Sequence, residues 1–233
     1  MTEIDLTGRV VLITGASRGI GYATARAALE AGARVVAGSR TPERLERAAA
    51  DLAAYGEITH RAIDVADYGD MEAFVELALA RFGRVDGLVN DAGVAWAGPF
   101  ADMPPAEIAA AVDVNVGGVL YATRAVLPHM LARGTGTVVN LSSGAGHAGI
   151  GGLAAYCASK FAVNGFTEAL ADEVGDAGVG VYAVCPGRVA TDMQETVSGR
   201  RQGLPPERIA ETVLSLLGPR PPVRSGQCLD VFQ

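Results

Sequence analysis

The sequence contains few of the residues from which metal centres and disulfide frameworks are built. It holds three cysteines and three histidines among 233 residues. The cysteines form no C-x-x-C pair and the histidines are scattered, so no spacing indicates a metal site or a disulfide set. We therefore expect buried thiols in a reducing compartment and no bound metal. The residues concerned are Cys157, Cys185, Cys228, His60, His129 and His147.

Basic residues and long apolar runs are also scarce. The net charge is −7, which argues against a protein that binds nucleic acid through its charge. No apolar run reaches the roughly 18 residues that a membrane span needs, and the first residues lack the basic and apolar parts of a signal peptide. Hydrophobic residues make up 49% of the chain and charged residues 19%. We expect a soluble, cytoplasmic globular protein without nucleic-acid or membrane partners.

Short apolar segments alternate with longer helical patterns along the chain. We expect helices at residues 19–31, 42–54, 71–82, 105–133, 155–177 and 206–217, and strands at residues 10–13, 34–39, 57–64, 87–90, 137–141, 180–185 and 228–231. Several strand segments are apolar throughout, which favours a parallel sheet that is covered on both faces. The sequence thus predicts one α/β domain over residues 1–233, with a doubly wound, Rossmann-type sheet of about seven strands. Its cofactor-binding half would cover about residues 1–135, and its catalytic and substrate half about residues 136–233.

A glycine-rich turn, Thr14-Gly15-Ala16-Ser17-Arg18-Gly19-Ile20-Gly21, lies between the first expected strand and the first expected helix. Glycines let the backbone approach a pyrophosphate, and a helix N-terminus presents free N–H groups. The spacing is G-x-x-x-G-x-G rather than the common G-x-G-x-x-G. The turn therefore indicates a dinucleotide site, and a purely structural tight turn is the alternative.

The second expected strand ends in Gly38-Ser39-Arg40 and carries no acid where NAD-binding proteins hold the ribose 2′-hydroxyl. Arg40 stands there instead, with Arg18 in the glycine-rich turn and Arg44 one turn further on. Guanidinium groups would bind a 2′-phosphate that a carboxylate would repel. The sequence favours NADP(H) over NAD(H); the alternative is that these arginines are ordinary surface charges.

Tyr156 and Lys160 are four positions apart and would share one face of a helix. A phenol has a pKa of about 10, so it transfers protons at neutral pH only when its anion is stabilised. A nearby ammonium group can do this, which makes the pair a candidate general acid/base unit. The spacing alone also occurs by chance on solvated helices.

Taken together and in order, these motifs resemble the single-domain, NADP(H)-preferring branch of the short-chain dehydrogenase/reductases over essentially the whole chain. The catalytic positions of that family are filled here by Asn115, Ser143, Tyr156 and Lys160. The cofactor positions implied by the resemblance are Gly15, Ser17, Arg18, Gly19, Ile20, Gly21, Ser39, Arg40, Asp64, Val65, Asn90, Ala92, Gly93, Tyr156, Lys160, Pro186, Gly187, Val189 and Thr191.

The resemblance implies hydride transfer between a nicotinamide and a carbonyl or secondary alcohol. Tyr156 would exchange the proton with the substrate oxygen, and Lys160 would stabilise the phenolate and bind the nicotinamide ribose. Ser143 would hydrogen-bond the carbonyl oxygen. Asn115 would kink its helix and anchor a water that links Lys160 to solvent. The family commonly forms homodimers or homotetramers through its two long helices. The helices expected near residues 112–131 and 155–170 carry more apolar surface than one sheet face needs, which favours the same assembly here.

The sequence departs from the family pattern in two places. Asp91 replaces the second asparagine of the Asn-Asn-Ala-Gly motif, and a carboxylate accepts hydrogen bonds but cannot donate them. Asp91 could thus weaken local stability or reshape the cofactor pocket. The segment from residue 192 to residue 204 is short where longer members carry a substrate lid, which predicts an open pocket.

Several alternatives stay open from the sequence. Ser142 competes with Ser143 as the catalytic hydroxyl, Asn115 could be a plain helix-interior amide, and Cys157 is expected to be a packed thiol. Trp96, His147 and Met193 are candidates for the substrate pocket.

The function has two rivals to a carbonyl reductase. The first is a non-catalytic NADP(H)-binding sensor or scaffold. The second is a ketoacyl-thioester reductase, for which Arg188, Arg200 and Arg201 would bind a phosphopantetheine arm or else be solvated charges. The sequence alone does not distinguish between these substrate classes.

Overall fold

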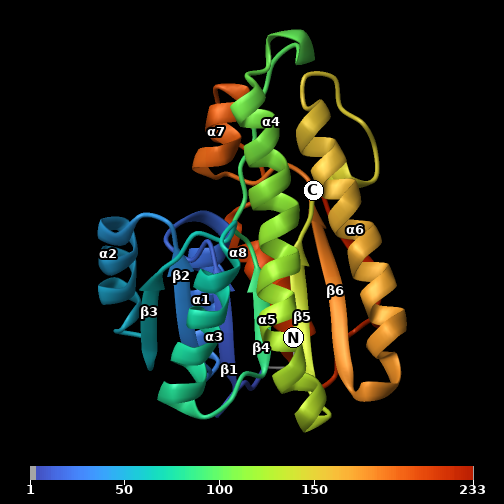
Figure 1. Ribbon diagram of the computed structural model, residues 1–233. Helices are drawn as coiled ribbons and strands as arrows, with labels where there is room; N and C mark the ends of the chain where they lie inside the picture. Colours follow the sequence, from blue (N-terminus) through green and yellow to red (C-terminus); the bar gives the residue numbers. More distant parts are fainter. Residues whose placement is uncertain (1–3, 233) are drawn as a thin grey trace.

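The apolar segments form a seven-stranded sheet in the computed structural model, which describes residues 4–232 (Figure 1). All neighbouring strands are parallel. The predicted doubly wound α/β fold is confirmed, because the order turns back at β1 and the next strand is added on its other side. Across the sheet the strands are β3 (Ile58–Ala62), β2 (Arg34–Ser39), β1 (Val10–Thr14), β4 (Gly87–Asn90), β5 (Gly136–Leu141), β6 (Val179–Pro186) and β7 (Cys228–Val231).

Alternate side chains of the central strands are buried on opposite faces of the sheet. Val11 and Ile13 of β1 face a cluster that includes residues of α1 (Gly19–Glu30), α2 (Pro42–Leu52) and α8 (Pro206–Leu217). Val10 and Leu12 face a cluster with α3 (Tyr68–Phe82), α5 (Gly118–Arg133) and α6 (Ala154–Val174). Because both faces are covered, these strands are apolar throughout. Figure 1 shows the second set of helices across one face.

The helix expected over residues 105–133 is interrupted. It consists of α4 (Pro105–Val112), a π-helical segment (Asp113–Gly117) and α5. The π segment carries Asn115, whose side chain bonds to the chain after β4 and to α6. Such a single π turn is a common device at functional sites. It realises the kink that the resemblance implied at Asn115.

A short helix, α7 (Asp192–Ser198), lies where the sequence predicted only a short open segment. Thr191 caps its start by accepting a hydrogen bond from the N–H of Gln194 at 3.3 Å. Gly199 ends it with a φ of +70°, which glycine adopts without strain. The Thr-x-x-Gln spacing followed by this glycine is a helix signal that the sequence analysis missed. Figure 1 places α7 beyond the carboxyl ends of the strands.

Smaller differences concern the ends of elements. β3 stops at Ala62 rather than at residue 64, so Asp64 lies in the loop that follows. Helix α3 begins at Tyr68 because Asp67 caps it, accepting a hydrogen bond from the N–H of Asp70. Helix α6 ends at Val174, and a 3₁₀ turn completes the expected helix.

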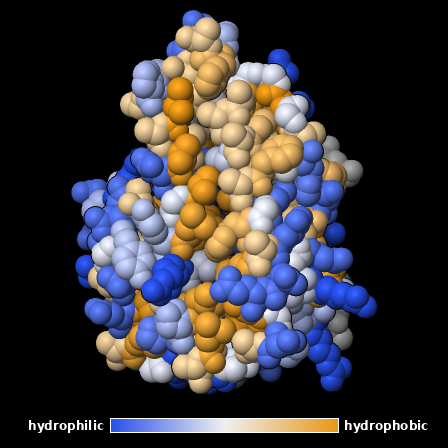
Figure 2. Space-filling view, turned by 45° about the vertical axis from the view of Figure 1, so that its right-hand side comes forward, coloured by the Kyte–Doolittle hydropathy of each residue, from blue (hydrophilic) through white to orange (hydrophobic). Residues whose placement is uncertain are grey.

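A hydrophobic band crosses the face that carries α5 and α6 (Figure 2). The large apolar side chains exposed on α4, α5 and α6 are Val112, Leu120, Tyr121, Leu131 and Phe161. Among residues 4–232, no helix has both the length and the apolar character that crossing a membrane requires.

Candidate active site

A cleft opens at the carboxyl ends of the strands, where ligands of doubly wound sheets bind. Ser142 and Asp192 line it together with many of the predicted site residues. Its wall includes these predicted site residues: Gly15, Ser17, Arg18, Gly19, Ile20, Ser39, Arg40, Asp64, Val65, Ala92, Gly93, Tyr156, Lys160, Thr191 and Met193. Other predicted residues are not part of the wall itself, namely Gly21, Asn90, Trp96, Asn115, Ser143, His147, Pro186, Gly187 and Val189.

The glycine-rich turn lies against the chain that follows β4. Gly15 has a φ of +73°, and a Cβ atom placed on it would be 2.8 Å from the backbone nitrogen of Ala92. Glycine is therefore required there for both conformation and space. Helix α1 begins at Gly19, and its N-cap residue, Arg18, makes no side-chain capping bond. The first turn of α1 also contains no acid, so its N–H groups and its dipole suit a pyrophosphate in the cleft.

The arginines of the cleft have different surroundings. The Arg18 guanidinium lies 2.8 Å from a carboxylate oxygen of Asp192 on α7, and Arg201 lies 3.1 Å from the other oxygen. This contact with Arg18 lowers the pKa of Asp192. Arg40 and Arg44 line the cleft and form no ion pair with any residue of 4–232. Sequence reasoning did not find Asp192 as a partner of Arg18, because the two lie on distant segments.

The candidate acid/base pair lies on α6. The Lys160 Nζ atom is 5.6 Å from the centre of the Tyr156 ring and donates a hydrogen bond of 2.7 Å to the carbonyl oxygen of Leu141. Burial lowers the pKa of Lys160 to about 8, against an opposing effect of Asp91. Burial raises the pKa of Tyr156 to about 12, although its hydrogen bond with Ser143 lowers it. In this state the phenol is protonated at neutral pH.

The two adjacent serines have different partners. The Ser142 hydroxyl is buried and donates to the carbonyl oxygen of Lys160 at 3.3 Å. The Ser143 hydroxyl accepts a bond from the N–H of Ala145 at 3.2 Å and lies near enough to Tyr156 to lower the pKa of its phenol. Of the two, Ser143 is thus the one in contact with the candidate acid/base residue.

Asn115 links the chain after β4 to the catalytic helix. Its amide donates to the carbonyl oxygen of Val94 at 2.9 Å and to the Ser159 hydroxyl at 3.0 Å, and its Oδ1 accepts from the Val94 N–H at 2.8 Å. Ser159 in turn donates to the carbonyl oxygen of Tyr156 at 2.7 Å. The fully buried Asn115 therefore fixes the position of the turn that carries Tyr156.

Asn90 and Asp91 of the Asn-Asp-Ala-Gly motif bind different parts of the structure. The Asn90 amide donates to Thr123 at 3.2 Å and to Asn140 on β5 at 2.9 Å, so it braces two strands and a helix. The Asp91 carboxylate accepts a bond of 2.8 Å from the N–H of Gly21 and thereby ties β4 to α1. Burial raises the pKa of Asp91 to about 7, even though the Gly21 bond and the charge of Lys160 lower it.

The remaining predicted residues lie at the margins of the site. Thr191 and Met193 form the α7 side of the cleft. Pro186 ends β6 and Gly187 follows it, while Val189 pairs with Leu204 in an isolated bridge. His147 lies outside the cleft wall, and its Nε2 atom is 3.2 Å from Oδ1 of Asp230 on β7. Trp96 packs against Gly98 in the loop after β4.

Sequence comparison reveals a family for this arrangement. A family model described as short chain dehydrogenase matches residues 9–202. A "Monensin polyketide synthase putative ketoacyl reductase" of Streptomyces virginiae is 42% identical, over 84% of this chain and 76% of the relative. "Probable oxidoreductase EphD" of Mycobacterium tuberculosis is 34% identical over 92% of this chain. The chain spans only 40% of the length of EphD.

Solved structures show the same fold. A 3-ketoacyl-(acyl-carrier-protein) reductase from Brucella melitensis, complexed with NADH, has a TM-score of 0.92 and 33% identity, with 98% of both chains covered. A variant of actinorhodin polyketide ketoreductase with NADPH has a TM-score of 0.92 and 34% identity, with 96% of this chain and 95% of the other covered. Both similar proteins carry a nicotinamide cofactor, one in each phosphorylation state.

Proposed function

This chain belongs to the short-chain dehydrogenase/reductase family, and from that premise we propose that it is an NADP(H)-dependent oxidoreductase of carbonyl or secondary alcohol substrates. The observation that carries the proposal is that Tyr156 and the buried Lys160, whose Nζ is 5.6 Å from the Tyr156 ring, line one cleft together with the glycine-rich turn. Oxidoreductase relatives disfavour the non-catalytic sensor. The cofactor would supply the hydride, and the chain's residues position it and handle the proton.

The cleft offers groups for four parts of such a cofactor. The start of α1 suits the pyrophosphate, with its Gly21 N–H already bonded to Asp91, and Asp64 with Val65 lines the place where the family holds the adenine. Arg40 and Arg44 offer guanidinium groups for a 2′-phosphate at the end of β2. Thr191, at the start of α7, would contact the nicotinamide amide.

In the proposed reaction, Tyr156 gives its proton to the substrate oxygen as negative charge develops there. A phenol whose pKa is raised to about 12 is in the protonated form that this step needs. Lys160 holds a positive charge near the ring, and Ser143 hydrogen-bonds the same oxygen, so that charge is stabilised from two sides. Asn115 keeps α6 in register with the loop after β4.

A ketoacyl thioester is the second candidate for the substrate. The 42% identity to a polyketide ketoacyl reductase favours it. Arg188, Arg200 and Arg201 are the basic residues near α7 that would bind a phosphorylated arm, although Arg201 is paired with Asp192. We further propose a homodimer or homotetramer, which would cover the hydrophobic band on α5 and α6 (Figure 2).

The proposal is tested by following NADPH oxidation with simple ketones, ketoacyl thioesters, steroids, sugars and quinones. We expect turnover with at least one carbonyl class, and faster turnover with NADPH than with NADH. If none of these carbonyls supports oxidation of either cofactor, the proposed function is wrong.

Arg40→Asp tests the cofactor preference. Removing a charge-assisted contact and adding a repelling carboxylate should lower kcat/KM for NADPH relative to NADH by roughly 10–100-fold. Arg47→Asp, on the exposed side of α2, is the matched control and should leave that ratio unchanged. An unaltered ratio in Arg40→Asp would show that the 2′-phosphate is bound elsewhere.

A further inference from the structure

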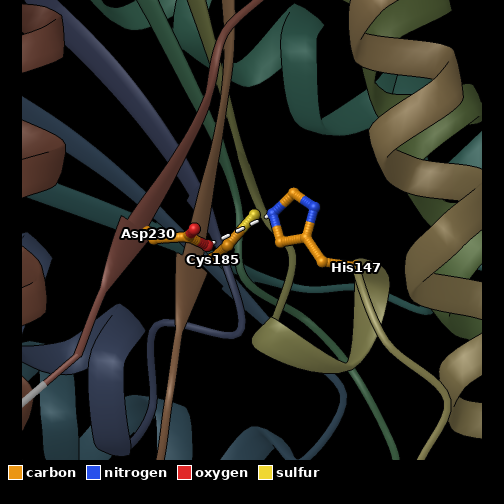
Figure 3. A group of neighbouring side chains, drawn as sticks. All are labelled: His147, Cys185 and Asp230. Atoms are coloured by element: carbon orange, nitrogen blue, oxygen red, sulfur yellow. Dashed lines mark ion pairs between the residues drawn. The ribbon is translucent and has the colours of Figure 1, made fainter.

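A second group of reactive side chains lies apart from the residues that line the cleft. His147 follows the 3₁₀ turn Gly144–Gly146, Cys185 belongs to β6, and Asp230 belongs to β7. Figure 3 shows the three side chains pointing toward one another from the loop and the two adjacent strands. Their ligand atoms all lie within 4.8 Å of one another. Three elements that are distant in sequence thus bring an imidazole, a thiol and a carboxylate together.

The sheet register explains why two of these side chains meet. Cys185 and Asp230 are directly paired in the parallel ladder between β6 and β7, so their side chains leave the same face of the sheet. Cys228 lies two residues before Asp230 and has the same orientation, which makes it the neighbour of the Cys185 thiol. The arrangement depends on backbone pairing and therefore has little freedom to drift apart.

The spacing of the donor atoms matches a tetrahedral metal site. The Nε2 atom of His147 lies 3.2 Å from Oδ1 of Asp230. Bonds of about 2.0–2.3 Å to a tetrahedral zinc ion place neighbouring ligand atoms roughly 3.3–3.8 Å apart. The imidazole and the carboxylate are about 0.1 Å closer than this range, and all three ligand atoms lie within 4.8 Å of one another.

The thiol is the buried member of the group. Cys185 is fully buried, its Sγ donates a hydrogen bond of 3.7 Å to the Oδ1 of Asn164, and Cys228 lies beside it. The side chains of His147 and Asp230 are 41% and 51% exposed, so these two ligands form the solvent-facing side of the group. Glu168 of α6 and Asp230 both add negative charge beside the thiol pair. The surroundings thus favour a cation, and one with affinity for sulfur and nitrogen.

We propose that His147, Cys185 and Asp230 bind one Zn²⁺ ion, with the fourth position open to solvent. This site could not be predicted from the sequence, because its residues follow no metal-binding spacing and come together only in the folded chain. The ion would fix His147 and with it the turn that begins at Ser143. The site does not depend on the proposed reaction, since none of its three ligands lines the cleft.

The test is zinc binding by the reduced, untagged protein, measured by competition with a chromogenic chelator. We expect one tight Zn²⁺ per chain and no comparable binding of Mg²⁺, which prefers oxygen ligands. Replacement of the zinc by Co²⁺ should produce the thiolate-to-metal charge-transfer band and the intense visible bands of a tetrahedral site. Absence of saturable binding, or cobalt spectra without a thiolate band, would overturn the proposal.

Variants separate this site from chance binding. His147→Gln and Asp230→Asn are substitutions of exposed side chains that need not disturb folding, and each should weaken zinc binding at least ~10-fold. His129→Gln, on the exposed surface of α5, is the matched control and should bind as the parent does. Cys185→Ser should lose the charge-transfer band, whereas Cys228→Ser should keep it. If His147→Gln binds as tightly as His129→Gln, or if Cys228→Ser alone removes the band, the assignment is wrong.

Discussion

Two aspartates flank β4, and they lie in very different surroundings. Asp86, before the strand, is buried and has Arg84 at 2.5 Å, Arg133 at 3.3 Å and the N–H of Val10 at 2.9 Å. Asp91, after the strand, accepts one bond from the N–H of Gly21 and has no guanidinium within ion-pair distance among residues 4–232.

The two aspartates show that buried charge is treated differently at the two edges of the sheet. At the amino edge the buried charge is compensated, which serves stability. At the carboxyl edge burial raises the pKa of Asp91 to about 7 and lowers that of Lys160 to about 8, so charge is held there at a cost to the fold. Groups with displaced pKa values gather at functional sites, and here they gather beside the cleft.

A substitution at the amino edge of the sheet should lower the stability of the protein and leave its catalytic rate unchanged. Asp86→Asn removes the negative charge that two guanidinium groups share, and it should lower the free energy of unfolding by about 2–3 kcal/mol. Urea denaturation measures this effect. The turnover number of the folded variant should equal that of the parent, because Asp86 lies at the opposite end of the strand from the cleft. A variant of normal stability would remove the contrast between the two edges.

The carboxyl edge should respond in the opposite direction. The raised pKa of Asp91 means that the unfolded chain releases a proton that the folded chain retains. This contribution to the free energy of unfolding is complete below about pH 3.8 and is lost as pH rises through about 7. Asp91→Asn keeps an acceptor for the Gly21 N–H and removes the penalty. Its advantage over the parent should grow by roughly 2–3 kcal/mol between about pH 5 and about pH 8 in urea melts. A variant less stable than the parent at the higher pH would contradict this.

The smallest expected effect is electrostatic. Lys160 is the only lysine in the sequence, so isotope-labelled lysine gives a single side-chain resonance for titration by NMR. Its pKa should lie near 8 in the parent and lower in Asp91→Asn, because the carboxylate raises it. The pKa of Tyr156 should also fall, since Asp91 contributes to its elevation, and the pH profile of kcat should shift toward lower pH. Unchanged pKa values for both groups would show that Asp91 and Lys160 are not coupled.

The sequence predicted the sheet because each strand signal was local. Continuous apolar segments and a glycine-rich turn follow from neighbouring residues, and the junctions between strands and helices then locate the cleft. It missed features that arise from contacts between distant segments. The pairing of Arg18 with Asp192, for example, joins the start of α1 to α7 across a long stretch of sequence.

The same distinction applies to the catalytic residues. The side-chain spacing on α6 suggested that Lys160 stabilises the Tyr156 phenolate, yet burial sets both pKa values in the structure. Burial comes from the packing around the whole cleft, and the charge of Asp91 comes from the end of β4, so the spacing on one helix cannot predict either effect. The neighbours of His147 could likewise not be predicted, because they come from β6 and β7.

Replacement of Tyr156 by phenylalanine tests the central claim most directly. Phenylalanine preserves the ring and removes the proton, so kcat for carbonyl reduction should fall roughly 10²–10⁴-fold. NADPH binding, followed by its fluorescence, should be unchanged, and Tyr55→Phe on the far side of the sheet should retain full activity. Turnover by Tyr156→Phe at the rate of Tyr55→Phe would contradict the account.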